Sequence, residues 1–190
     1  MKKPFFKLLI CLSIIFGIGF STTAKAQLFS PGDKVLNLGL GFGVAWGVTY
    51  STVQVPPIAV SFDYGWRDDL GPGIVGLGGY LGYASYAWES SWLGGSYGYK
   101  VSSTVIGAIG TYHMDLVDNL DTYGGLLLGF RIVSDKATGT WAGAYSSSVG
   151  SGLTGSLFIG AKYYFSDNIG AFAELGYGIA YFTLGASFKL

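Results

Sequence analysis

Bulky apolar residues alternate with small residues along most of this chain. In residues 36–46, every second position carries a leucine, phenylalanine, valine or tryptophan, and the positions between carry asparagine, glycine or alanine. Side chains of a β-strand point alternately to the two faces of a sheet, so this pattern predicts a strand. Each interior glycine costs a helix about 1 kcal/mol relative to alanine, which argues against a transmembrane helix. Eleven residues are long enough for a tilted strand to cross a bilayer.

The same alternation recurs in residues 58–67, 123–133 and 152–165, and the charged residues there share a face with glycine and small polar groups. A soluble barrel would have its apolar face inside and many charges outside. Charged residues make up only 12% of this chain, about half the usual share of a soluble domain. The apolar face is therefore expected to meet lipid. Strands in lipid must close on themselves, because an open edge would leave backbone groups unpaired in hydrocarbon.

The alternating segments predict an all-β fold, a closed antiparallel eight-stranded up-and-down transmembrane β-barrel. An even strand count returns both termini to the same side of the membrane, which in this class is the periplasm. Short turns are expected on that side and longer loops outside, except for a short final hairpin near residues 176–179. The predicted strands are 34–46, 58–67, 73–87, 99–113, 123–133, 152–165, 169–177 and 180–190.

The first 26 residues have the features of a cleaved signal peptide. Three lysines precede an apolar core of 13 residues, and the small residues Ala24 and Ala26 form a cleavage site before Gln27. The core is short for a membrane span. We therefore expect residues 1–26 to be removed and residues 27–190 to form one barrel domain. The mature chain has neither a basic stripe nor a lysine run, so no nucleic-acid partner is predicted.

The carboxy-terminal part of the chain carries a family resemblance. Residues 160–178, "GAKYYFSDNIGAFAELGYG", and the strand after them resemble the small OmpA/OmpX-type outer-membrane β-barrel family of Gram-negative bacteria, a porin-like barrel domain. The end matches the assembly signal of that class. The resemblance implies location in the cell outer membrane, contact with outer-membrane lipid, recognition by the barrel-assembly machinery during biogenesis, and a monomer. The signal residues are Thr183, Gly185, Phe188 and Leu190.

Five charged residues are expected to point into the barrel and form an interior polar network. An eight-stranded barrel is only just wide enough for its own side chains, which favours a structural network over an ion-selecting lining. Counting back from the turn at residues 166–168 places Lys162 opposite Phe172 and diagonal to Glu174, within reach of an ion pair. The five residues are Asp63, Arg67, Arg131, Lys162 and Glu174.

The chemistry that the sequence offers is sparse. His113 is the single histidine, Asp115 is near it in sequence, and a structural role for His113 is expected. We predict no catalytic residue, metal site or cofactor. The expected function is a non-enzymatic outer-membrane barrel whose loops, rich in Ser, Tyr, Trp and Gly, serve envelope integrity or contact with an unidentified extracellular ligand. The alternatives are a narrow porin-like channel and, less favoured, a lipid-modifying enzyme.

Overall fold

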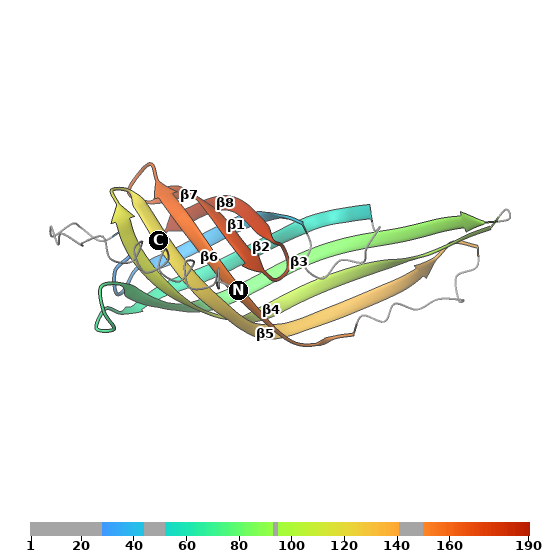
Figure 1. The fold of residues 1–190 in the computed structure, drawn as a ribbon, viewed down its shortest axis with the longest axis horizontal. Coiled ribbons are helices and arrows are strands. Elements are labelled where there is room, and N and C mark those ends of the chain that lie inside the picture. Colours follow the sequence, from blue (N-terminus) through green and yellow to red (C-terminus); the bar gives the residue numbers. More distant parts are fainter. Residues whose placement is uncertain (1–27, 44–51, 93–94, 141–149) are drawn as a thin grey trace, which may run out of the picture.

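Eight antiparallel strands make up most of the chain that the computed structural model describes, namely residues 28–43, 52–92, 95–140 and 150–190 (Figure 1). The predicted signal peptide, with Ala24 and Ala26, lies outside these residues, as do residues 44–46 of the first predicted strand. Within the described residues, no helix is long and apolar enough to cross a membrane. The strands are β1 (Lys34–Phe42), β2 (Thr52–Arg67), β3 (Ile74–Trp92), β4 (Gly95–Val117), β5 (Leu120–Thr138), β6 (Gly152–Tyr164), β7 (Ile169–Tyr177) and β8 (Phe182–Lys189).

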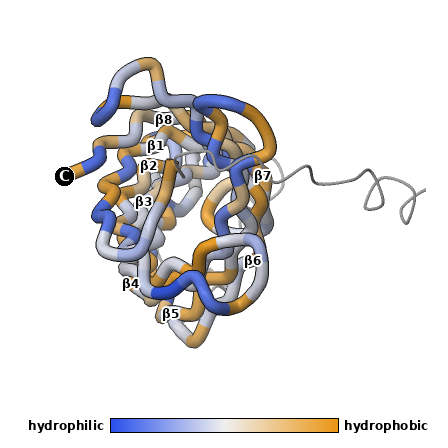
Figure 2. The backbone as a smooth tube through the Cα atoms, turned by 90° about the vertical axis from the view of Figure 1, so that its left-hand side faces the viewer, coloured by the Kyte–Doolittle hydropathy of each residue, from blue (hydrophilic) through white to orange (hydrophobic). Residues whose placement is uncertain are grey.

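The strands form a closed ring in chain order. Each strand pairs with the next, and β8 pairs with β1 from Val35↔Lys189 to Phe42↔Phe182. Figure 2 shows the ring viewed from its end. The predicted eight-stranded up-and-down barrel is therefore confirmed, and its closure leaves no open edge around the wall.

The outer face of the wall is apolar and the inner face is polar. Leu128 is 67% exposed and Leu157 is 71% exposed, whereas Asn37, Asp63 and Ser187 are buried inside. A contiguous apolar surface of this extent does not face water in a soluble protein. The chain is a transmembrane β-barrel, with the facing that the alternation predicted.

The strands extend further at one end of the barrel than at the other (Figure 1). Lys34, the first residue of β1, and Lys189, the last residue of β8, share one end with the turns at residues 68–73, 118–119 and 165–168; we call it the terminus end. At the opposite end, β3, β4 and β5 continue beyond the level where β1 and β8 stop. We call this extension, residues 84–92, 95–103 and 133–138, the arm.

The arm corrects two predicted loops. Residues 88–98 and 134–151 were expected to be loops, yet β3 and β4 stay paired up to Trp92↔Gly95, and β4 and β5 up to Gly98↔Thr138. Residues 93–94 and 141–149 of these predicted loops lie outside the described residues. Serine and glycine in these segments suggested loops. Continuous backbone pairing with the neighbouring strand overrides that weak local preference.

A third predicted loop, residues 47–57, is also partly strand, because β2 begins at Thr52, while residues 47–51 lie outside the described residues. The pairing of β2 with β3 shifts register between Val53 and Val55 and again between Val55 and Ile58, around Pro56 and Pro57. Proline has no N–H to give to a ladder and is therefore found at such bulges. The strand continues past the prolines at the cost of two irregular pairs.

The hairpin between β7 and β8 folds into the barrel. Ile179 and Ala180, at its tip, are buried and pack in an apolar cluster. This cluster fills the lumen at the base of the arm. Its other members are Ala84, Tyr86, Val105, Ile109 and Leu127.

Glycine at the β1–β8 seam makes room for an inward aromatic ring. Gly39 and Gly185 are direct partners across the seam, and Phe172 of β7 lies over them. A Cβ at Gly185 would overlap the carbonyl oxygen of Leu38 and lie 2.8 Å from Phe172 Cζ. The glycine of the predicted assembly signal thus has a packing reason in the folded barrel.

We expect Gly185→Ala to lower the free energy of unfolding by at least about 1–3 kcal/mol, the usual cost of overpacking. The matched control is Gly155→Ala on the outer face of β6, where a Cβ would meet its nearest atom, Leu127 O, at 3.6 Å. Equilibrium unfolding in urea measures both variants. Equal stability of the two variants would contradict the packing at the seam.

Candidate functional site in the barrel interior

Four buried side chains form a hydrogen-bonded cluster inside the terminus end. His113 on β4 lies between Asp63 of β2 and Asp121 of β5, with Nε2 3.0 Å from Asp63 Oδ2 and Nδ1 2.8 Å from Asp121 Oδ2. The hydroxyl of Thr111 donates to Asp63 Oδ2 at 2.9 Å. Because both ring nitrogens face a carboxylate, the imidazole donates to both only as the imidazolium. The cluster thus joins three strands that are not all neighbours.

The strands place these side chains on one face by their period of two. Thr111 and His113 are two residues apart on β4, so both point inward. Asp121 follows the tight turn at residues 118–119, where Asn119 has a φ of 62°. Asp121 pairs with Asp115, one inward position from His113, and is therefore diagonal to the imidazole. Asn119 tolerates the left-handed conformation that the turn requires, because its side chain is short and polar.

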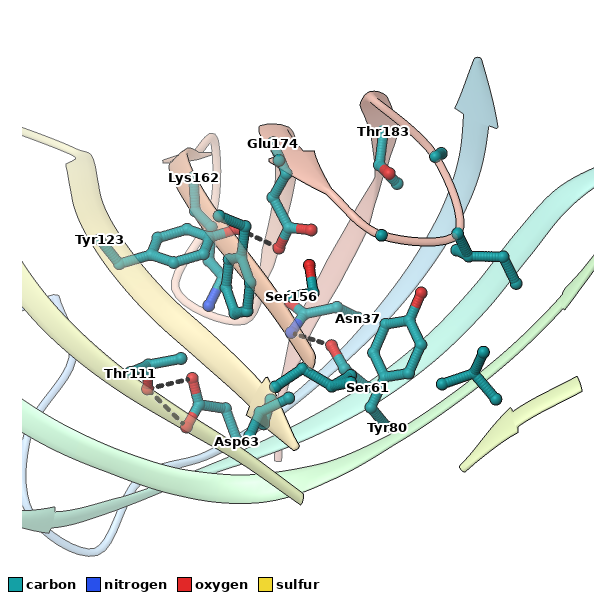
Figure 3. Close-up of a pocket in the computed structure, with 18 residues that line it drawn as sticks. Asn37, Ser61, Asp63, Tyr80, Thr111, Tyr123, Ser156, Lys162, Glu174 and Thr183 are labelled. Atoms are coloured by element: carbon teal, nitrogen blue, oxygen red, sulfur yellow. Dashed lines mark hydrogen bonds between the residues drawn. The ribbon is translucent and has the colours of Figure 1, made fainter. Parts of the chain in front are cut away.

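Lys162 and Glu174 line the same part of the interior as Asp63 and Thr111 of this cluster (Figure 3). The predicted register is confirmed: Lys162 pairs with Phe172, and Glu174 pairs with Gly160. The predicted direct ion pair between Lys162 and Glu174 is not formed. Glu174 Oε1 accepts a hydrogen bond from the Tyr123 hydroxyl at 2.7 Å, and Lys162 Nζ lies 4.3 Å from the centre of the Tyr123 ring. Tyr123 therefore contacts both charged groups, Lys162 through its ring and Glu174 through its hydroxyl.

The two arginines of the predicted network lie elsewhere. Arg67 is at the end of β2, its side chain is 43% exposed, and it pairs with Asp69 outside the barrel. Arg131 pairs with Gly152, ten ladder positions from the pair of Asp121 with Lys162. Ten positions are about 33 Å along a strand. The interior network therefore contains Asp63, Lys162 and Glu174 from the prediction, and not Arg67 or Arg131.

The segment before β1 closes the terminus end. Phe29 is 1% exposed and stacks on the ring of His113, with ring centroids 4.0 Å apart. Asp115, the sequence neighbour of His113, binds the backbone N–H of Leu28 at 2.7 Å and not the histidine. Lys189 Nζ lies 2.7 Å from Asp33 Oδ2 and donates to Leu28 O. The last strand thereby holds this segment in place.

The residues of the predicted assembly signal occupy both faces of β8. Thr183 lines the interior and Gly185 meets Phe172 there, whereas Phe188 pairs with Leu36 of β1 and Ile169 of β7. Leu190 follows the strand and donates its N–H to Lys34 O. The whole signal therefore lies in or next to the strand that closes the ring.

A cavity of about 50 Å³ with a mixed polar and apolar lining lies next to Asp63 and Thr111 of the histidine cluster. Its polar lining includes Asn37, Ser61, Asp63, Lys162, Glu174 and Thr183 (Figure 3). Phe29 closes the interior at the terminus end, and the apolar cluster with Ile179 closes it below the arm. The charged groups therefore lie between a buried aromatic ring and a buried apolar cluster.

This geometry supports a structural role for His113. The order Thr111, His113, Asp121 has the donor pattern of a nucleophile, a base and an orienting acid, but Thr111 is buried and also bonded to Asp63. A nucleophile needs a space beside it for a reacting substrate, and the cavity that Thr111 lines holds only about 50 Å³. Among the described residues, no group of three His, Cys, Asp or Glu side chains is placed to hold a metal ion.

Four residues of the site were missed by the sequence analysis: Phe29, Thr111, Asp121 and Tyr123. Asp121 was placed in a turn because the predicted strands ended at 113 and began again at 123. Asn119 beside Asp118 is a signal for a two-residue turn, which would have extended both strands and turned Asp121 inward. Phe29 lies outside every alternating segment, so the pattern carried no signal for it.

No family model matches the chain, and no curated protein sequence matches it. Solved structures that are similar in fold include the N-terminal β-barrel domain of Pseudomonas aeruginosa OprF, with 20% identity, a TM-score of 0.48 and coverage of 84% of this chain and 98% of that one. The attachment invasion locus protein Ail of Yersinia pestis has 14% identity, a TM-score of 0.49 and coverage of 84% and 99%. A de novo designed transmembrane β-barrel has 15% identity, a TM-score of 0.44 and coverage of 85% and 98%. The strand pairing itself gives the chain the architecture of the small OmpA/OmpX-type barrels that its sequence resembles.

We expect Asp63→Asn to lower the free energy of unfolding by about 3 kcal/mol, because it removes one charge of a buried hydrogen-bonded group. Asp69→Asn is the matched control. Asp69 is exposed and pairs with Arg67, so its loss should change stability by less than about 1 kcal/mol. Urea unfolding of both variants in lipid vesicles measures the difference. A loss for Asp63→Asn no larger than for the control would show that the cluster is not formed.

Proposed function

We propose that this chain is a non-enzymatic integral outer-membrane protein of a Gram-negative bacterium, with its terminus end in the periplasm and its arm outside the cell. Its role is surface contact or envelope integrity, through the side chains that the arm presents. The observation that carries the proposal is the continuation of three paired strands well past the barrel wall, up to Trp92↔Gly95.

The outer face changes chemistry where the arm leaves the wall. Along β4, the outward positions run from Ile106 through Thr104 to Ser102 and then Lys100. Ser102 pairs with the exposed Ser134 and with Ser85, which is buried, and the exposed Lys100 pairs with the exposed Lys136. Serine and lysine suit the headgroup region and water, whereas lysine in hydrocarbon is costly. This gradient supports a membrane border near the serine row, with the arm in water beyond it.

A paired sheet presents its side chains differently from a loop. Backbone hydrogen bonds join the paired strands, so the side chains on the sheet keep fixed relative positions. A partner binding such a surface has less conformational entropy to remove than at a mobile loop. The arm therefore suits contact with an extracellular ligand, whose identity we do not assign. For biogenesis we propose recognition of Thr183, Gly185, Phe188 and Leu190 by the barrel-assembly machinery, and a monomeric barrel.

The blocked interior favours this role over a channel. Conduction needs a continuous wet path, and here an apolar cluster, a cavity of about 50 Å³ and the ring of Phe29 follow one another along the axis. A lipid-modifying enzyme would need catalytic groups open to lipid at the outer rim. The histidine of this barrel is buried at the opposite end.

The orientation can be tested by labelling intact cells with a membrane-impermeant amine reagent. We expect Lys100 and Lys136 of the arm to be modified and Lys34 at the terminus end to remain unmodified, as read by peptide mass spectrometry. All three are exposed in the folded barrel. The control is labelling after permeabilisation of the outer membrane, when Lys34 should react as well. Modification of Lys34 alone on intact cells would reverse the proposed orientation.

In planar lipid bilayers, the purified protein should insert without giving discrete conductance steps. The reason is that Phe29 and the apolar cluster with Ile179 obstruct the lumen one after the other. The comparison is the double variant Phe29→Ala/Ile179→Ala, in which both obstructing side chains are shortened. It conducts if the rest of the lumen holds a continuous path of water. Regular single-channel steps from the wild-type protein would instead favour the porin-like alternative.

A further inference from the structure

The segment before β1, residues 28–33, is held at the terminus end from its first residue onward. The N–H of Leu28 donates to Asp115 Oδ2 at 2.7 Å, and Lys189 Nζ donates to Leu28 O at 3.1 Å. The next residue, Phe29, is 1% exposed. The position of Leu28 relative to the carboxylate of Asp115 is therefore set by the fold.

Leu28 is one residue away from Gln27, the predicted first residue of the mature chain, which lies outside the described residues. Cleavage after Ala26 turns the nitrogen of Gln27 from a neutral amide into an α-ammonium group, which is mostly charged at neutral pH. Backbone bond lengths allow at most about 3.7 Å between the nitrogens of successive residues. Because Leu28 N is 2.7 Å from Asp115 Oδ2, the new ammonium group lies no more than about 6.4 Å from that oxygen in every conformation of Gln27.

The charges around Asp115 favour a cation at this place. Among the described residues, neither a lysine nor an arginine forms an ion pair with Asp115. The two nearby cationic groups are engaged elsewhere, since His113 lies between two other aspartates and Lys189 Nζ is 2.7 Å from Asp33 Oδ2. The titratable groups that surround Asp115 and Leu28 are Asp118, Asp121, Asp167, His113, Tyr164 and Lys189.

The terminus end also has room for the amino terminus beside Leu28. A cleft of about 380 Å³ is lined by Leu28, by Asn119 of the turn between β4 and β5, and by Asp167 of the turn between β6 and β7. The amide and the carboxylate in this lining suit an ammonium group and the side-chain amide of a glutamine.

We propose that Asp115 is the binding site for the mature amino terminus and holds the α-ammonium group of Gln27 beside the N–H of Leu28. The proposal rests on the predicted cleavage after Ala26 and is independent of the role proposed for the arm. Removal of the signal peptide then supplies a positive charge that the precursor lacks. This charge strengthens the attachment of the segment that carries Phe29 into the barrel.

The test is the pH dependence of acylation of the α-amino group, measured by peptide mass spectrometry on the folded, processed protein. The uncharged amine is the form that reacts, so the midpoint of the rate profile gives the pKa of the group, whereas restricted access slows the reaction equally at every pH. A neighbouring carboxylate favours the ammonium form. We expect the wild-type midpoint to lie above the ordinary α-amino range of about 7.7–8.0. At pH 7, Asp115→Asn should react about two- to fivefold faster.

Asp115→Asn isolates the charge, because asparagine keeps an oxygen that accepts the N–H of Leu28. Asp69→Asn is the matched control: it removes a carboxylate that pairs with Arg67 at the same end, and it should leave the midpoint unchanged. A third variant carries one alanine inserted between Ala26 and Gln27. It moves the ammonium group along the chain by about 3.6 Å and leaves the contacts of Leu28 in place, so its midpoint should fall toward the ordinary range.

Equal midpoints for the wild type and Asp115→Asn would overturn the proposal. If Asp115→Asn does not fold, the alanine insertion decides, and a wild-type midpoint in that variant would overturn the proposal as well. A shift in Asp69→Asn as large as in Asp115→Asn would reduce the effect to net charge and count against the site. The intact mass is measured first: a mature chain that does not begin at Gln27, or whose terminal amine is lost by cyclisation to pyroglutamate, would also refute the proposal.

Discussion

Pairing of the last strand with the first is the constraint on which the rest of this structure depends. In hydrocarbon there is no water to bind backbone N–H and C=O groups, so a sheet that crosses a membrane must close. Here the closure runs from Val35↔Lys189 to Phe42↔Phe182. Closing eight strands fixes a narrow interior. The large side chains then have to point outward into lipid, and glycine becomes necessary where an inward ring such as Phe172 crosses the seam.

The narrow interior also determines how its charges are held. A charge taken out of water must be compensated by partners within the protein. The barrel solves this by layers: Phe29 lies on His113, two aspartates flank the imidazole, and Lys162, Tyr123 and Glu174 follow. Each layer draws on strands that are distant in sequence. The contacts therefore join opposite walls of the ring and not only neighbouring strands, which opposes collapse or shearing of the barrel.

The sequence alone was sufficient for the wall of the barrel and for part of its interior. The alternation of apolar and small residues correctly placed Leu128 outside and Asp63 and Glu174 inside. In a strand each side chain points to one of only two faces, so the pattern leaves little choice. The tight turn at residues 166–168 set the register of Lys162 with Phe172, since a short turn leaves one way to pair. What failed was the choice of partners and the strand ends. Side-chain reach, as for Tyr123, and pairing that continues through serine-rich segments, as in the arm, are tertiary effects that no local pattern contains.

The long arm and the short β7–β8 hairpin belong to one arrangement. The base of the arm carries the apolar residues Ala84 and Val105 on its inner face, where the lumen would otherwise meet water. Ile179 and Ala180 cover these residues only because the hairpin is short enough to turn inward. A longer hairpin would protrude and leave the apolar base exposed. Burial of this base joins the arm to the barrel wall as part of the same core.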